Sequence, residues 1–110
     1  MTTAEPPSLS ANRLPVEITQ IVGEVLKLRR IQHGATAEVV EVRSRRGLFI
    51  VKRATRQPFQ DWLGREYRVL GMLARSGLPI PQAYLYLERP AASGRSHWLV
   101  TERLPGRPLR

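Results

Sequence analysis

Apolar residues recur at helical spacing near the start of the chain. The first set consists of Leu14, Ile18, Ile21, Val22 and Val25, and Pro15 is compatible with a first helical turn. This spacing predicts a helix over about residues 15–26 that packs on the domain or acts as a lid. The preceding residues 1–13 contain two prolines and small polar residues, so we expect them to form a flexible tail.

The spacing changes to that of β-strands after residue 27. Three short stretches, "LRRI" (28–31), "AEVVEV" (37–42) and "LFIV" (48–51), are β-branched and either alternating or continuously apolar. The separators "QHG" and "SRRG" both end in glycine, which favours turns between strands. The pattern predicts a three-stranded meander. The imperfect alternation in "AEVVEV" indicates a bulge or a strand buried on both faces.

A second helical pattern begins after Pro58. Its apolar stripe is formed by Phe59, Leu63, Leu70 and Leu73. Gly77 suits the left-handed conformation that ends a helix, and the prolines that follow it prevent continuation. Gly64 and Gly71 each cost this helix about 1 kcal/mol relative to alanine, so we expect another group to approach the helix closely at both positions.

Two more strands are predicted from "AYLYLE" (83–88) and "HWLVTE" (97–102). The order of elements is therefore helix, three strands, helix and two strands, and 110 residues suffice for one domain at most. The predicted fold class is α+β: a five-stranded antiparallel sheet with one packed helix, preceded by an N-terminal helix.

Composition narrows the function classes. The formal net charge of +9 points to an anionic partner, although the arginines are scattered, and a surplus of solvated arginine from coding bias would give the same total. The chain contains no cysteine and two histidines, which excludes disulfides and argues against a dedicated zinc site. No apolar run approaches the ~18 residues of a membrane span. No secretory leader is visible at residues 1–12, so we expect a cytoplasmic protein without membrane contact.

Two charged residues stand in apolar surroundings. Lys52 ends the apolar stretch of "GLFIVKRA" (47–54), and it is one of only two lysines among 18 basic residues. Glu66 lies on the apolar stripe of the second predicted helix, three residues after Leu63 and four before Leu70. Either both side chains extend to solvent, or Glu66 is paired with Lys52, because an unpaired carboxylate facing a core is costly. In the second interpretation, lysine presents a compact charge to nucleotide phosphates, whereas arginine would favour a planar, bidentate partner.

The order of these features resembles the N-terminal lobe of protein-kinase-like enzymes, and most of all the aminoglycoside phosphotransferase family. The motifs that carry the resemblance are "QHGATAEVVEV" (32–42), "LFIVKRA" (48–54), "REYRVLGML" (65–73), "LPIPQAYLY" (78–86) and "HWLVTERLPGRPL" (97–109). Each motif alone is weak, whereas their order and spacing together are fairly specific. The resemblance implies a nucleotide-binding lobe of a small-molecule kinase that uses ATP, with Mg²⁺ bound mainly by a C-terminal lobe.

The resemblance also implies roles for particular residues. Lys52 would contact the phosphates of the nucleotide, and Glu66 would be its ion-pair partner on the helix. Gly34, Ala35 and Thr36 would form the turn that covers the nucleotide, with one glycine where protein kinases have G-x-G-x-x-G. A reduced turn of this kind is similar to that of the phosphotransferase relatives, but the same residues also fit an ordinary hairpin turn.

The same resemblance places the adenine ring. Val39 and Ile50 would supply apolar contacts to it. The segment from Val100 to Arg103 would be the hinge, in which the carbonyl of Thr101 accepts a hydrogen bond from the adenine edge and the N–H of Arg103 donates one. These are main-chain contacts, so a register shifted by one residue would satisfy the sequence equally well.

Phosphoryl transfer on this fold needs a catalytic aspartate and metal ligands from a second lobe. The chain has a single aspartate, Asp61, near the start of the second helix, and a single asparagine, Asn12, in the expected tail. We therefore divide the chain into a tail (1–13), a nucleotide-binding lobe (14–103) and the start of a linker (104–110) to a C-terminal catalytic lobe. We expect no turnover from these residues alone.

Two other functions are compatible with the sequence. A basic nucleic-acid-binding module would show affinity that falls steeply with salt, and basic side chains on one face of the sheet. Against it, aromatic residues make up only 6% of the chain and no strand carries an aromatic platform. A non-catalytic interaction domain would keep the lobe fold as a scaffold.

Overall fold

The computed structural model describes residues 9–33, 37–91 and 94–103. Its elements are, in chain order, the 3₁₀-helix η1 (Ala11–Arg13), α1 (Val16–Val22), β1 (Val25–His33), β2 (Ala37–Ser44), β3 (Gly47–Ala54), α2 (Phe59–Leu73), β4 (Ala83–Ala91) and β5 (Gly94–Glu102). The strands form one five-stranded antiparallel sheet in the order β1-β2-β3-β5-β4. The α+β fold class predicted from the sequence is confirmed. Within the described ranges, no helix is long and apolar enough to cross a membrane.

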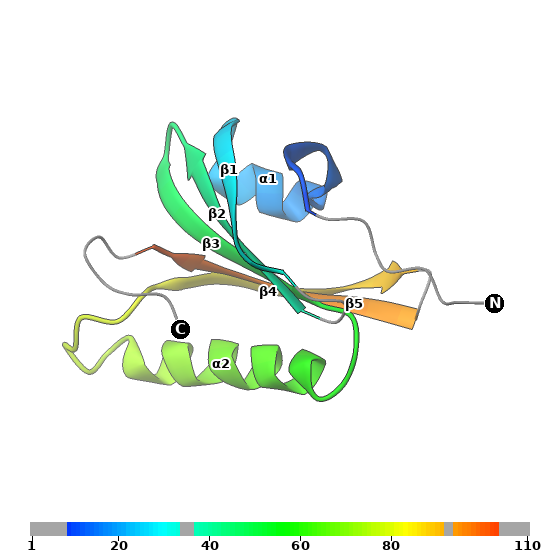
Figure 1. The fold of residues 1–110 in the computed structure, drawn as a ribbon. Helices are drawn as coiled ribbons and strands as arrows, with labels where there is room; N and C mark the ends of the chain where they lie inside the picture. The colour runs from blue at the N-terminus through cyan, green and yellow to red at the C-terminus, as the bar shows by residue number, and fades with distance from the viewer. Residues whose placement is uncertain (1–8, 34–36, 92–93, 104–110) are drawn as a thin grey trace.

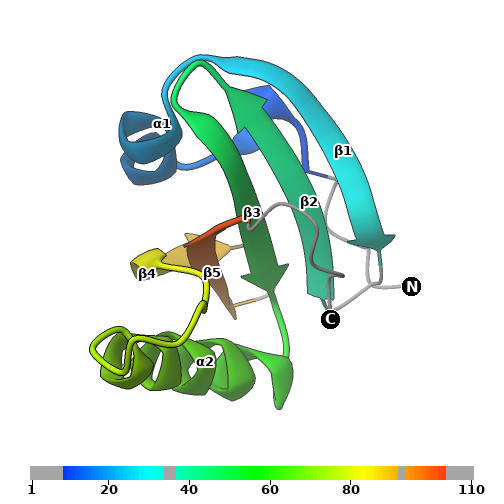
Figure 2. The same cartoon turned by 90° about the vertical axis from the view of Figure 1, so that its left-hand side faces the viewer.

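The two α-helices cover opposite faces of the sheet, which we call the α1 face and the α2 face (Figure 1). Helix α2 packs against β3, β4 and β5. Strands β1 and β2 continue the sheet past β3, away from the strands on which α2 packs (Figure 2). Because side chains alternate between faces along a strand, each strand contributes to both layers.

The main hydrophobic core lies between α1 and the sheet, and a smaller one lies under α2. The first consists of buried Leu9, Leu14, Ile18, Val22, Val40, Val42, Phe49, Val51, Trp98 and Val100. The second consists of Ala54, Leu63 and Leu99, with Phe59 and Tyr86 packed beside them. Burial of these side chains is the main term that holds the layers together.

Helix α1 is shorter than the predicted 15–26. It ends just before Gly23, which adopts φ +78° and turns the chain into β1. The guanidinium of Arg46, from the β2–β3 turn, donates hydrogen bonds to the carbonyls of Gln20 at 2.6 Å and Ile21 at 3.0 Å. A cation at this helix end satisfies carbonyls that have no partner within the helix. The long apolar pattern therefore joins a two-turn helix to the start of a strand.

The segment from Leu9 to Arg13 belongs to the folded domain, which corrects the expected flexible tail of residues 1–13. The Leu9 side chain is buried, and its backbone N–H donates to both carboxylate oxygens of Glu38, at 3.2 and 3.1 Å. The anchoring group lies 29 residues away in the chain, so local composition could not reveal it. Residues 1–8 of the expected tail lie outside the described residues.

Strand β2 alternates regularly between the two faces, which corrects the expected bulge or double-sided burial. Glu38, Val40 and Val42 are buried on the α1 face, and the residues between them are partly exposed on the α2 face. The alternation looked imperfect only because a glutamate occupies a core position. The irregular pairing lies in β1, at two places: between Val25 and Lys27, and between Arg30 and Gln32, opposite Val40 and Val39.

Glu38 is a buried carboxylate held between two arginines, with 1% of its surface exposed. Arg53 Nη2 lies 3.0 Å and Arg30 Nε 3.4 Å from its oxygens. The Arg53 guanidinium also lies 5.7 Å from the centre of the Trp98 ring. Burial lowers the pKa of Arg53 from its ordinary value, while the charge of Glu38 and the hydrogen bond to it oppose that shift. The carboxylate thereby connects β1, β2 and β3 with the N-terminal segment.

Helix α2 begins where the sequence predicted but ends before Gly77, the expected terminal residue, which adopts φ +79° beyond the helix. It begins at Phe59, directly after Pro58, and ends at Leu73, whose carbonyl accepts hydrogen bonds from the hydroxyl and the N–H of Ser76 at 2.6 and 2.9 Å. Leu63 carries the buried side of the helix. Several large apolar side chains of the helix remain exposed, namely Trp62, Tyr67, Val69, Met72 and Leu73, although the ring of Tyr67 stacks on that of Tyr86 in β4.

The two helical glycines differ in their surroundings. A Cβ at Gly64 would lie 3.3 Å from the hydroxyl oxygen of Tyr86 and 3.4 Å from its ring carbon, so the expected close approach is confirmed there. A Cβ at Gly71 would meet no atom within 4 Å, so the expectation was wrong at that position. The absence of a side chain at Gly64 therefore leaves room for Tyr86 of β4 beside α2.

Replacing Gly64 and Gly71 by alanine should change stability in opposite directions. Gly71→Ala is expected to raise the free energy of unfolding by about 1 kcal/mol, because alanine favours a helix and nothing opposes the new methyl group. Gly64→Ala gains the same propensity but presses its methyl against Tyr86, so we expect a net loss of about 1 kcal/mol. Denaturant titrations measure both changes, and equal gains would contradict the close contact.

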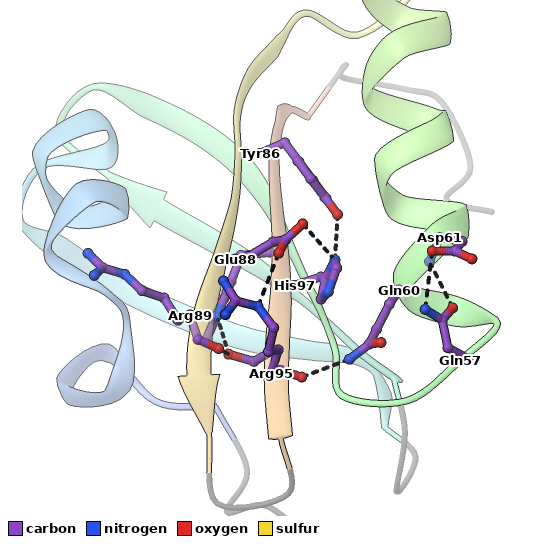
Figure 3. A network of polar contacts seen from close by, with 10 residues as sticks. Gln57, Gln60, Asp61, Tyr86, Glu88, Arg89, Arg95 and His97 are labelled. Atoms are coloured by element: carbon purple, nitrogen blue, oxygen red, sulfur yellow. Dashed lines mark hydrogen bonds and ion pairs between the residues drawn. The ribbon is translucent and has the colours of Figure 1, made fainter.

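A polar network connects the first turn of α2 with β4 and β5 (Figure 3). The hydroxyl of Tyr86 is hydrogen-bonded to Nδ1 of His97, and Glu88 lies 3.9 Å from the same nitrogen. The amide of Gln60 donates to the carbonyl of Arg95 at 2.7 Å. Together with the Gly64 contact, these bonds fix the position of α2 along the sheet.

Tyr86→Phe should flatten the loss of stability at alkaline pH. Burial raises the pKa of Tyr86, and the negative charges of Glu88 and Asp61 add to the shift. The unfolded chain then releases this proton first, so the stabilisation from Tyr86 is complete below about pH 10 and declines as the pH rises above it. The free energy of unfolding, measured at each pH, tests this. An unchanged alkaline slope in the variant would contradict it.

Candidate functional site

Lys52 lies on the α2 face of the central strand β3. Its main chain pairs with Val39 of β2 on one side and with Leu99 of β5 on the other. Because both neighbouring strands hold it, the backbone at this position is fixed. Its side chain is directed toward α2 and is 18% exposed.

Glu66 meets this ammonium group from α2. Lys52 Nζ lies 3.0 Å from Oε1 and 2.7 Å from Oε2 of Glu66. The position follows from Leu63, one turn earlier, which is buried in the cluster that includes Ala54 of β3. Packing of that leucine turns the same side of the helix, and with it the carboxylate, toward β3. The ion pair weighed as one of two interpretations of the sequence is confirmed.

The pair matters for geometry more than for stability. Glu66 is 36% exposed, so solvent screens the attraction and its contribution stays within about 1 kcal/mol. An ammonium group has three N–H donors, and the carboxylate of Glu66 engages two of them. The pair thus holds a cation in a defined place with a donor left for an anionic oxygen.

Three of the other predicted site residues gather beside Lys52 on the α2 face. Val39 stands directly opposite Lys52, and Ile50, two residues before Lys52, stands opposite Thr101 of β5. Ile50 and Thr101 are buried and Val39 is partly buried. The face beside the cation is therefore apolar over a short distance along β2 and β3.

Two other predicted residues that the structure describes, Val100 and Arg103, do not present the predicted groups on this face. Val100 pairs with Val51 and is fully buried in the core under α1, because alternation along β5 puts its side chain on the opposite face from Thr101. The N–H of Arg103 donates to the carbonyl of Leu48 at 3.1 Å, so in this conformation it is not free to bind adenine. Gly34, Ala35 and Thr36 lie outside the described residues.

Sequence reasoning missed an ion-pair chain on the same face. Glu41, which stands opposite Ile50, has its carboxylate 3.1 Å from Nε of Arg103 and 3.3 Å from Nη2 of Arg29. Glu41 and Arg103 are 17% and 18% exposed, so the contact is largely shielded from water. A signal was present, since Glu41 is two residues after Val39 and had to share its face.

The two residues weighed for catalysis in the sequence lie elsewhere. Asp61 is exposed in the first turn of α2, where it accepts a hydrogen bond from the side chain of Gln57 at 3.2 Å. Asn12 is exposed within η1. Within residues 9–33, 37–91 and 94–103, no three His, Asp or Glu side chains are grouped to hold a metal ion.

A five-stranded antiparallel sheet, with a central-strand lysine paired to a helical glutamate, has the architecture of the N-terminal lobe of protein-kinase-like proteins. A model of the phosphotransferase enzyme family matches residues 27–110, well over half of the sequence. The chain belongs to the phosphotransferase enzyme family, as the resemblance indicated. A search of curated proteins found no match.

Proposed function

We propose that this chain is the ATP-binding lobe of a phosphotransferase that acts on a small molecule. The observation that carries the proposal is the Lys52–Glu66 pair, in which the two carboxylate oxygens lie 3.0 and 2.7 Å from the ammonium nitrogen. Family membership supports a phosphotransferase, and the pair supplies a site for the phosphates of its nucleotide.

In this proposal different residues of the α2 face bind different parts of the nucleotide. Lys52 binds an oxygen of the α- or β-phosphate, and Glu66 keeps the ammonium from rotating away. Val39 and Ile50 contact the base, while main-chain groups near Thr101 bind its edge. A fixed cation is effective because it costs no reorganisation when the phosphate arrives.

The transfer step needs groups that the described residues do not bring to Lys52. A catalytic aspartate and Mg²⁺ ligands would come from a further lobe, and bound Mg²⁺ would neutralise phosphate charge there. This chain's contribution is to bind and orient the nucleotide. We therefore expect these 110 residues to bind ATP weakly and to turn over none.

A titration of the chain with ATP, read by calorimetry, tests the proposal. We expect saturable binding that inorganic tripolyphosphate displaces, because the phosphates are the part that Lys52 recognises. Absence of ATP binding at millimolar ligand would overturn the assignment.

A binding titration with labelled single-stranded RNA tests the alternative function, a nucleic-acid-binding module. Lys27 and Arg43 stand directly opposite each other on the uncovered part of β1 and β2, and both are exposed. If they form a nucleic-acid surface, affinity should fall with a log–log salt slope of about −0.7 per phosphate contact. Tight RNA binding with such a slope, and none of ATP, would replace the proposed function with the nucleic-acid module.

A further inference from the structure

The side chain of Arg103 crosses the α2 face from the end of β5 to β2. Its backbone N–H is bonded to Leu48 of β3 at 3.1 Å, and its Nε is bonded to Glu41 of β2 at 3.1 Å. Strand β3 lies between β2 and β5, so the side chain has to pass over β3 to reach the carboxylate. Glu41 stands opposite Ile50, which places the crossing at the level of Leu48 and Ile50.

This crossing lies where the proposed function puts the base. Ile50 is only 3% exposed, although the apolar cluster under α2 is centred further along β3, at Ala54. The N–H of Arg103, the expected donor to the base edge, is also engaged. The Ile50 side chain is therefore covered by the chain itself, and the Arg103 N–H is already hydrogen-bonded. The ammonium of Lys52, in contrast, keeps a donor for phosphate.

We propose that the Glu41–Arg103 ion pair is a latch over the base-binding part of the site, and that it must open before a nucleoside can bind. The proposal rests on the proposed function, because it assumes that the base lies on Ile50. The latch lowers apparent affinity for the base by the fraction of molecules in which it is open. It leaves binding of the phosphates to Lys52 unaffected.

The surroundings of Glu41 make opening inexpensive. When Arg103 leaves, Glu41 still has Arg29, whose Nη2 lies 3.3 Å from its other oxygen. A largely shielded carboxylate is thus never left without a cation, which would be the costly outcome. Arg29 comes from β1 on the far side of β2 from β3. It shares the carboxylate without crossing the base site, so it supplies a matched control.

Adenosine and inorganic tripolyphosphate probe the two halves of the site separately. Both are titrated into the whole chain and its variants at about 0.3 M salt, where distant charges are screened. Arg103→Ala and Glu41→Gln are expected to tighten adenosine binding about tenfold, because the closed population is lost. Tripolyphosphate affinity should stay within about twofold of the parent. Arg29→Ala should leave adenosine affinity unchanged.

Weaker adenosine binding in Arg103→Ala would overturn the latch and make Arg103 a direct contact of the base, and unchanged binding would overturn it as well. A failure of the proposed function looks different: tripolyphosphate would not bind, or Lys52→Ala would not affect it. In that case hydrogen exchange at the Arg103 amide still tests whether the Glu41–Arg103 ion pair acts as a latch. The latch requires faster exchange in Glu41→Gln than in Arg29→Ala, and equal rates would refute it.

Discussion

Replacing Lys52 by alanine is expected to weaken ATP binding at least tenfold while leaving the fold intact. The change removes a charge-assisted hydrogen bond to a phosphate oxygen, worth roughly 1.5–3 kcal/mol, or about tenfold to a hundredfold in affinity. The Lys52–Glu66 pair is partly exposed, so its loss should cost less than about 1 kcal/mol in the free energy of unfolding. Calorimetric titration and denaturation of the same samples measure the two effects.

Lys27→Ala is the matched control for this prediction. Lys27 is the other lysine of the chain and is exposed on β1, so its replacement removes the same charge without touching the Lys52–Glu66 pair. We expect its ATP affinity to remain within about twofold of the parent. An equal loss in both variants would show that ATP responds to net charge only. In a longer form that transfers phosphate, full turnover by Lys52→Ala would refute the assignment of Lys52.

The geometry explains why this position has a lysine in an arginine-rich chain. An arginine here would match the carboxylate of Glu66 with its planar fork and form two parallel hydrogen bonds. Lysine meets the same carboxylate as a point charge with rotatable donors, which leaves one directed elsewhere. Lys52→Arg should therefore keep the ion pair and still lose affinity for phosphate.

The elements next to the Lys52–Glu66 pair were predictable because their signals are local. A run of β-branched residues before Lys52, a helix start after Pro58 and a glutamate on the stripe of Leu63 all lie within a few residues of what they determine. Their order then placed strand against helix. The ion pair remained one of two interpretations, which the cost of an unpaired Glu66 favoured and the structure decided.

The errors arose where a distant partner decides the structure. Leu9 is buried because Glu38 binds its N–H from another strand, and Glu38 is buried because two arginines surround it. A hydrophobic pattern treats glutamate as a solvent-facing residue. It therefore predicted neither the burial of Glu38 nor the burial of Leu9, which depends on Glu38. The early end of α1 at Gly23 and the engagement of the Arg103 amide by Leu48 likewise depend on contacts that spacing does not contain.

Glu38→Ala should lower the free energy of unfolding by about 3–5 kcal/mol, because removing one partner of a buried ion pair leaves an uncompensated charge. Arg53 and Arg30 lose the carboxylate between them, and the Leu9 N–H loses its acceptor. A domain of this size has a total stability of roughly 5–15 kcal/mol. The substitution would therefore remove a large share of it, and the denaturant midpoint would fall accordingly.

Two further variants show whether burial and charge cause this loss. Glu24→Ala removes an exposed carboxylate paired with exposed Arg45, and it should change stability by no more than about 0.5 kcal/mol. Glu38→Gln keeps an oxygen that can accept from Leu9 but removes the charge between the arginines, so its cost should fall between the other two. Hydrogen exchange at the Leu9 amide should accelerate most in Glu38→Ala. If Glu38→Ala were as stable as Glu24→Ala, Glu38 would not anchor the N-terminal segment, because the energy of this cluster depends on its exclusion from water.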